Sequence, residues 1–138
     1  MGRLLSRSLA PVLLLSATPG LGCMPGEFNF ATGSARLNPR DHWVIADILR
    51  QFRARPGVVV ELTAATDGIG PADANLRLAR RRGEAVKAAL VRRGIPARVI
   101  RIVAEGAGGR RGADPYMRVV SYALIEAAAP ARSNTDHC

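Results

Sequence analysis

Apolar residues along this chain change their spacing from one segment to the next, and each spacing predicts an element. In a first helix, apolar residues recur at intervals of three and four positions, on one helical face: Ile45, Ile48, Leu49 and Phe52. Asn38 offers a capping side chain and Pro39 suits a first turn, so this helix is expected to begin there. The pair at 56–57, Pro-Gly, ends it. Trp43 is expected in the core or at its edge.

A continuous apolar run at residues 58–65 predicts a strand at the centre of a sheet, covered on one face by helices. A second helix is expected at 73–93, where Gly94 and Pro96 stop it. Its buried stripe is predicted to consist of Leu76, Ala79, Gly83, Val86 and Leu90.

Further strands are predicted at 28–30, 101–104 and 117–126, with a Gly- and Arg-rich loop before the last of them. The element order is therefore β-α-β-α-β-β. This order indicates an α+β sandwich, in which one mixed sheet has helices packed on one face.

Composition narrows the class of protein. The chain has 138 residues, enough for one domain, and only 4% of them are aromatic. The formal net charge is +9, and Lys87 is the only lysine. Arginine suits the recognition of phosphate or carboxylate, although a GC-rich coding bias gives the same composition. The shortage of aromatic side chains opposes nucleic-acid binding, which depends on base stacking.

The N-terminal segment has the order of a secretory signal. Arg3 and Arg7 precede an apolar run at 9–17, and a Pro- and Gly-rich stretch follows at 18–26. We therefore expect a signal peptide at 1–22, a short linker at 23–26, the domain at 27–126 and a disordered tail at 127–138. A disordered N-terminal tail is the alternative. The prolines and glycines argue against a membrane-spanning helix.

Cys23 follows Gly22. The signal of a bacterial lipoprotein ends in such a small residue, followed by the cysteine that becomes acylated. Leu21 stands two places ahead of the cysteine instead of the usual three, so the pattern is imperfect. Lipidation of Cys23 and ordinary cleavage nearby both remain open. Neither the cysteines nor the histidines have the spacing of a zinc site or of a nucleophile with its base. We therefore expect no metal, no cofactor and no catalysis.

The segment after the central strand carries the candidate site. It reads T-D-G-I-G-P-A-D-A-N-L-R-L-A-R-R-R over residues 66–82. Taken alone, Asp67 before a glycine is typical of an Asx turn, Asn75 of a helix cap, and Arg82 of a solvated helix face. A carboxylate and a guanidinium side by side would instead hold the ammonium and the carboxylate of a free amino-acid group.

This segment resembles the hallmark G-H-T-D-x-x-G, N, L-S-x-x-R-A of the OmpA-like peptidoglycan-binding domain. That family includes the C-terminal half of outer membrane protein A, Pal lipoproteins and MotB stators. The matching positions are Thr66, Asp67, Gly70, Asn75, Leu78 and Arg82. Segments 28–39, 93–100 and 105–108 extend the resemblance over about residues 27–126. The chain departs from the pattern at Ala64, Ala65, Ala79 and Gly83, and its C-terminal R-R-V-E signature is reduced to the segment 117–120, Met-Arg-Val-Val.

The resemblance implies that Asp67 binds the ammonium of the diaminopimelate side chain in peptidoglycan peptide stems, and that Arg82 binds its carboxylate. It places Asn75 in the lining of the same site. Thr66 and Ile69 would contribute mainly backbone groups. Arg118 either supports the site from the last strand or is an exposed strand residue.

The function implied is that of a non-enzymatic tether in the periplasm, at the outer membrane. Its partners would be peptidoglycan, outer-membrane lipid through an acylated Cys23, and other envelope proteins. The alternative is an OmpA-like scaffold that has lost the wall ligand and serves as an adaptor for envelope proteins. The replaced Gly-His pair and the reduced C-terminal signature favour that alternative.

Overall fold

The computed structural model describes residues 26–127. Its main elements are β1 (Glu27–Asn29), α1 (His42–Ala54), β2 (Val58–Ala65), α2 (Ala72–Arg92), β3 (Ile100–Gly106) and β4 (Val119–Glu126). Three short 3-10 helices join them: η1 (Pro39–Asp41), η2 (Ala97–Val99) and η3 (Pro115–Met117). Within residues 26–127, no helix combines the length and the apolar character that a membrane span requires.

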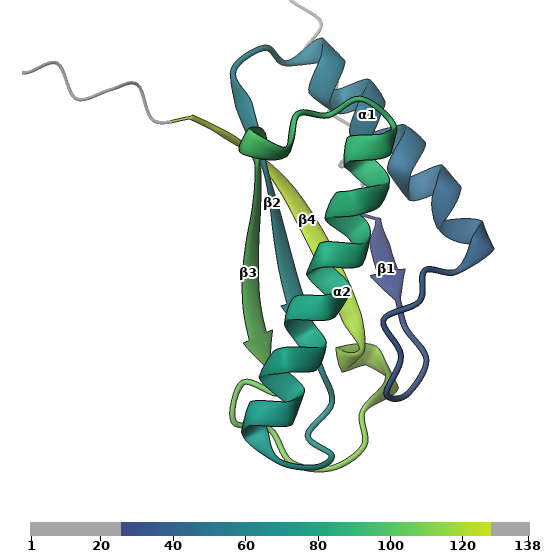
Figure 1. Ribbon diagram of the computed structural model, residues 1–138, viewed down its shortest axis with the longest axis vertical. Coiled ribbons are helices and arrows are strands. Elements are labelled where there is room, and N and C mark those ends of the chain that lie inside the picture. Colours follow the sequence, from purple (N-terminus) through teal and green to yellow (C-terminus); the bar gives the residue numbers. More distant parts are fainter. Residues whose placement is uncertain (1–25, 128–138) are drawn as a thin grey trace, which may run out of the picture.

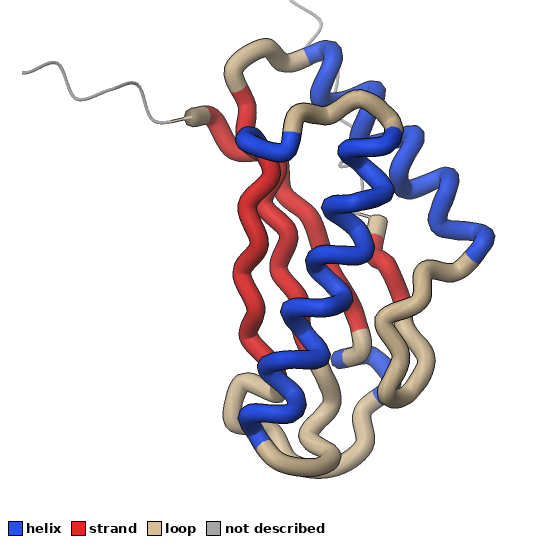
Figure 2. Tube along the Cα trace, viewed as in Figure 1, coloured by secondary structure: helices blue, strands red, loops and turns tan. Residues whose placement is uncertain are grey.

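The strands form one sheet in the order β1-β4-β2-β3. β2 and β3 are parallel, whereas β4 is antiparallel to both β1 and β2. The two helices pack on the same face, α2 along β2 and β3 and α1 towards β4 and β1 (Figure 1, Figure 2). The predicted α+β sandwich with a mixed sheet is therefore confirmed, and β2 is its central strand with the bounds expected from the apolar run.

The core consists of aliphatic side chains from the sheet and both helices. Val60, Leu62 and Ala64 of β2 are fully buried, because alternate residues of the strand face the helices. Gly83 lets α2 approach β3 closely, since a Cβ atom there would lie 2.6 Å from Cγ2 of Ile102. This close approach packs the middle of α2 against β3.

The first helix begins as the sequence predicts. The Asn38 side chain accepts a hydrogen bond from the Arg40 backbone N–H at 2.9 Å, and the Asp41 carboxylate accepts one from the Asn38 N–H at 2.8 Å. These two bonds form a capping box around η1. The helix therefore starts with a 3-10 turn, and α1 proper follows at His42.

Two expectations about the core are wrong. Trp43 is 73% exposed and Leu76 is 41% exposed. Trp43 lies two positions before Ile45, about 200° away around the helix, so it points outwards when Ile45 points inwards. In α2 the buried stripe begins at Asn75 instead of Leu76 and includes Arg82, because polar side chains at this end of the helix turn towards the loops.

Tyr122 joins β4 to α1 through a polar cluster. Its hydroxyl donates to Asp47 Oδ2 at 2.8 Å and accepts from Gln51 Nε2 at 3.1 Å. The hydrogen bond from Tyr122 is the largest cause that lowers the pKa of Asp47. Burial, and then the bond to Asp47, raise the pKa of Tyr122 above its usual value of 10.0. The packing of α1 on β4 is thus coupled to the protonation of the Tyr122 hydroxyl.

We expect Tyr122→Phe to lower the free energy of unfolding by about 1 kcal/mol at neutral pH, because one internal hydrogen bond is lost. A raised pKa stabilises the fold below the ordinary pKa, and this contribution is lost as pH rises through the folded value. The difference between the two proteins should therefore shrink above pH 10.0 in denaturant titrations. A difference that stays constant into that range would contradict the assigned coupling.

Candidate functional site

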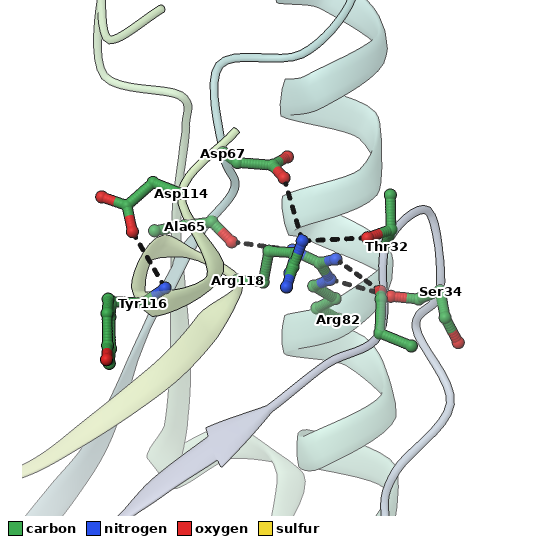
Figure 3. A network of polar contacts seen from close by, with 9 residues as sticks. Thr32, Ser34, Ala65, Asp67, Arg82, Asp114, Tyr116 and Arg118 are labelled. Atoms are coloured by element: carbon green, nitrogen blue, oxygen red, sulfur yellow. Dashed lines mark hydrogen bonds and ion pairs between the residues drawn. The ribbon is translucent and has the colours of Figure 1, made fainter. Parts of the chain in front are cut away.

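The candidate site lies where β2 ends, and it draws on segments far apart in the sequence. Asp67 comes from the loop after β2, and Arg82 from α2. Thr32 and Ser34 come from the loop between β1 and η1, and Arg118 lies directly before β4. Figure 3 shows these side chains turned towards one another. The fold therefore brings Asp67, Arg82 and Arg118 into one polar cluster.

The Asp67 carboxylate forms an ion pair with Arg118. Its Oδ2 atom lies 3.4 Å from Nη1 of Arg118, and the same nitrogen donates to Thr32 Oγ1 at 2.9 Å. Asp67 is only 5% exposed. The Nε atom of Arg118 is buried and has no hydrogen-bond partner among residues 26–127. Arg118 is thus held at one nitrogen and keeps unused donors inside the site.

Arg82 is fully buried and fastens three segments together. Its Nε donates to the carbonyl of Ser34 at 2.8 Å, Nη1 to that of Ala65 at 3.1 Å and Nη2 to that of Ala31 at 3.2 Å (Figure 3). A guanidinium has five N–H groups, so one remains on each of the two terminal nitrogens. Arg82 therefore holds the loop between β1 and η1 against the end of β2, and its remaining N–H groups have no exposed surface.

The guanidinium group of Arg82 is poorly solvated. Burial lowers the pKa of Arg82, and the negative charge of Asp67 opposes that lowering. The guanidinium carbon also lies 5.2 Å from the centre of the Phe30 ring, within the range of a cation–π contact. Asp67 is thus the counter-charge for two guanidinium groups, although its direct ion pair is with Arg118.

The other predicted site residues have different surroundings. Thr66 is fully buried, and its hydroxyl has no partner in the part of the chain that the structure describes. Asn75 is buried inside the first turn of α2, so the helix-cap interpretation is wrong: the cap position is Pro71. Ile69 is 50% exposed on the loop. Cys23 lies outside the described residues, as do the expected signal peptide at 1–22 and nearly all of the expected linker and tail.

Asn75 faces a neighbouring hollow of about 500 Å³ instead of the Asp67–Arg118 pair. The hollow lies between the start of α2 and the loop after β3, and its lining also includes Gly68, Glu105, Arg110 and Arg111. Two backbone hydrogen bonds between Gly68 and Gly112, of 2.8 and 3.3 Å, join the loops around it. A Cβ atom on Gly68 would overlap the backbone of Arg110, so only glycine fits there.

The sequence did not indicate the residues from the loop between β1 and η1. Ala31 and Ser34 contribute backbone carbonyls, which any residue type could provide, and they precede Arg82 by 51 and 48 positions. Thr32 contributes its hydroxyl. The one available signal was the segment 28–39, which matched the opening of the family pattern without any assigned role.

The fold and the site together define a small α+β domain with a charged cluster at the carboxyl end of its central strand. The OmpA family model matches residues 29–118. Because this match covers more than half of the chain, the protein belongs to the OmpA family.

Several known proteins are similar to this chain. The probable lipoprotein YiaD of Escherichia coli is 31% identical over 78 residues, which are 56% of this chain and 36% of YiaD. The chain thus spans about a third of the length of that relative. Among solved structures, the peptidoglycan-associated lipoprotein of Burkholderia pseudomallei is 20% identical with a TM-score of 0.64, over 72% of this chain and 89% of its own. The C-terminal domain of Helicobacter pylori MotB is 17% identical with a TM-score of 0.63, over 75% and 86% of the two chains. At these identities the structural likeness shows the fold.

Proposed function

We propose that this protein is a non-enzymatic tether of the bacterial envelope that binds the peptide stems of peptidoglycan. Membership of the OmpA family and the fold shared with a peptidoglycan-associated lipoprotein support this function. The observation that carries it is the cluster at the end of β2. There a nearly buried carboxylate, Asp67, meets the guanidinium of Arg118, whose buried Nε has no hydrogen-bond partner among residues 26–127, and acts as a counter-charge to the buried Arg82.

The ligand group that fits this cluster is a zwitterion, and the side-chain end of diaminopimelate is one. Asp67 would accept the ammonium, and Arg82 and Arg118 would donate to the carboxylate. The Asp67–Arg118 separation of 3.4 Å exceeds the usual 2.7–2.9 Å of a charge-assisted hydrogen bond, so this contact is weak enough to be replaced. A ligand carboxylate would also give the buried Nε of Arg118 the acceptor that it lacks.

The neighbouring hollow would take the rest of the stem. It opens beside Gly68, directly after Asp67, and Asn75 and the backbone of the Gly-rich loop line it. Thr66 and Ile69 flank the loop on its buried and exposed sides. In this arrangement the zwitterion is recognised by charge, and the adjoining peptide by shape and backbone contacts.

The anchor is the N-terminal segment. Acylation of Cys23, after removal of residues 1–22, would attach the domain to the outer membrane on its periplasmic side. The similarity to a probable lipoprotein supports this arrangement. A single acyl chain binds a membrane weakly, whereas two or three hold firmly. Only two residues separate Cys23 from Gly26, where the described domain begins.

The proposal is tested by sedimentation with purified sacculi. The protein should pellet with sacculi whose stems contain diaminopimelate, and free meso-diaminopimelate should release it. Nα-acetyl-lysine amide is the matched competitor, since it has the side-chain ammonium but no carboxylate, and it should release little. If the protein stays in solution with these sacculi, the adaptor alternative holds and wall binding is wrong.

A further inference from the structure

The end of the molecule opposite the candidate site carries a concentration of arginines, which we call the basic end. It consists of Arg53, Arg55, Arg92, Arg93 and Arg98, all of them exposed. They gather because both helices end here, while β2 and β3 begin here (Figure 1). β2 runs from this end to the site, and its 8 residues span about 26 Å.

The charge of the basic end is almost uncompensated. None of its five arginines forms an ion pair within residues 26–127, and Arg55 reaches only the carbonyl of Leu124, at 3.5 Å. Glu126 is the one acidic residue at this end of the described chain. At the site end, by contrast, acidic and basic side chains are mixed, with Asp67, Asp73 and Asp114 near the arginines. The basic end is thus distinguished by the near absence of acidic side chains among the described residues.

Helix capping explains only part of this concentration. Arg53 and Arg92 lie in the last turns of α1 and α2, where a cation interacts favourably with the helix dipole. Arg98 lies outside both helices, in η2. Nor can the rest of the chain neutralise the surface. Residues 1–25 contain no acidic residue, and residues 128–138 contain one arginine and one aspartate.

We infer that the basic end is a docking surface for the anionic phospholipid headgroups of a membrane leaflet. The guanidinium fork binds phosphate oxygens in pairs, which suits arginine better than lysine for this partner. Val91, 40% exposed and directly before Arg92 in α2, adds apolar surface for the interfacial region. Because the basic end and the site lie at opposite ends, the domain can contact a membrane and another polymer at the same time.

The test is binding of the full chain to vesicles. Phosphatidylethanolamine vesicles that contain phosphatidylglycerol should bind it, and vesicles of phosphatidylethanolamine and phosphatidylcholine give the background that does not depend on charge. The combined variant R53Q, R92Q, R93Q and R98Q should bind the anionic vesicles about tenfold or more weakly. The matched control R36Q, R40Q, R80Q and R81Q loses the same charge from exposed positions elsewhere and should bind like the wild type.

Two results would overturn the inference. One is equal loss of vesicle binding in the two combined variants, which would mean that net charge alone attracts the protein. The other is wild-type binding to soluble polyglutamate as strong as to anionic vesicles, which would indicate an acidic protein partner. Sacculus sedimentation of the same variants separates this inference from the proposed function, because the basic end should not affect it.

Discussion

Asp67→Asn is expected to abolish sedimentation with sacculi, with a loss of affinity of about thirtyfold or more. The substitution keeps the shape of the side chain and removes the negative charge that, within residues 26–127, faces the two guanidinium groups. Truncating one partner of a buried, hydrogen-bonded charge pair costs about 2 kcal/mol or more, which corresponds to that factor. Binding is measured by the fraction of protein that pellets as the amount of sacculi increases.

The matched control is Asp114→Asn at the same end of the molecule. Asp114 is a carboxylate that accepts the backbone N–H of Tyr116 at 3.0 Å, and asparagine can accept the same bond. This variant should pellet like the wild type. If Asp67→Asn also pellets like the wild type while its melting temperature is unchanged, the carboxylate does not hold the ligand ammonium.

Arg82→Lys is expected to lower the free energy of unfolding by about 3 kcal/mol or more. The charge is retained, but a single ammonium cannot reach the three carbonyls that Nε, Nη1 and Nη2 now satisfy. The unpaired buried carbonyl of Ala65 and a displaced buried charge both destabilise the fold. For a domain of this size the melting temperature should fall by more than about 10 °C.

The control for this prediction is Arg81→Lys, the exposed neighbour on the same helix, which should melt within a degree or two of the wild type. If Arg82→Lys is as stable as the control, the fastening of the loop between β1 and η1 is misassigned. Sedimentation of Arg82→Lys cannot decide the question alone, because loss of the loop would also remove the binding surface. Stability is therefore the informative measurement for Arg82, and binding for Asp67.

The sequence predicted the parts of the fold that follow from spacing. The apolar run at 58–65 gave β2 its bounds, and α2 begins only one residue before the expected start. The last strand starts later than expected because Pro115–Met117 form a 3-10 turn that the Asp114 side chain caps. Trp43 and Leu76 were misplaced, since an apolar residue next to a buried stripe has no local signal that decides which way it faces.

The sequence indicated which charged residues meet at the end of β2. It did not indicate the backbone groups that hold them there. Asp67 and Arg82 are fifteen positions apart in the sequence, and only the family pattern indicated that they share a site. The carbonyls of Ala31 and Ser34, which occupy Arg82, are backbone groups whose position depends on the tertiary fold. For the same reason the sequence could not show that Arg118, instead of Arg82, is the direct ion-pair partner of Asp67.

The two ends of the molecule suggest how a tether of this kind is oriented. The polar cluster of Asp67, Arg82 and Arg118 at the end of β2 would engage the wall. The basic end would lie against an anionic leaflet. These two contacts rest on different residues and are affected by different variants. Loss of one in the experiments above should therefore leave the other intact.

The central claim, that Asp67 and the neighbouring guanidiniums receive a zwitterion, is tested most directly by following the arginine Nε–H signals in an NMR titration. Addition of meso-diaminopimelate should shift the Arg118 Nε–H signal strongly downfield and slow its exchange with water, as the buried donor gains a carboxylate. Nα-acetyl-lysine amide, which has the ammonium but no carboxylate, should leave the signal in place at the same concentration. An Arg118 signal that does not respond to meso-diaminopimelate at saturating concentration would contradict the account.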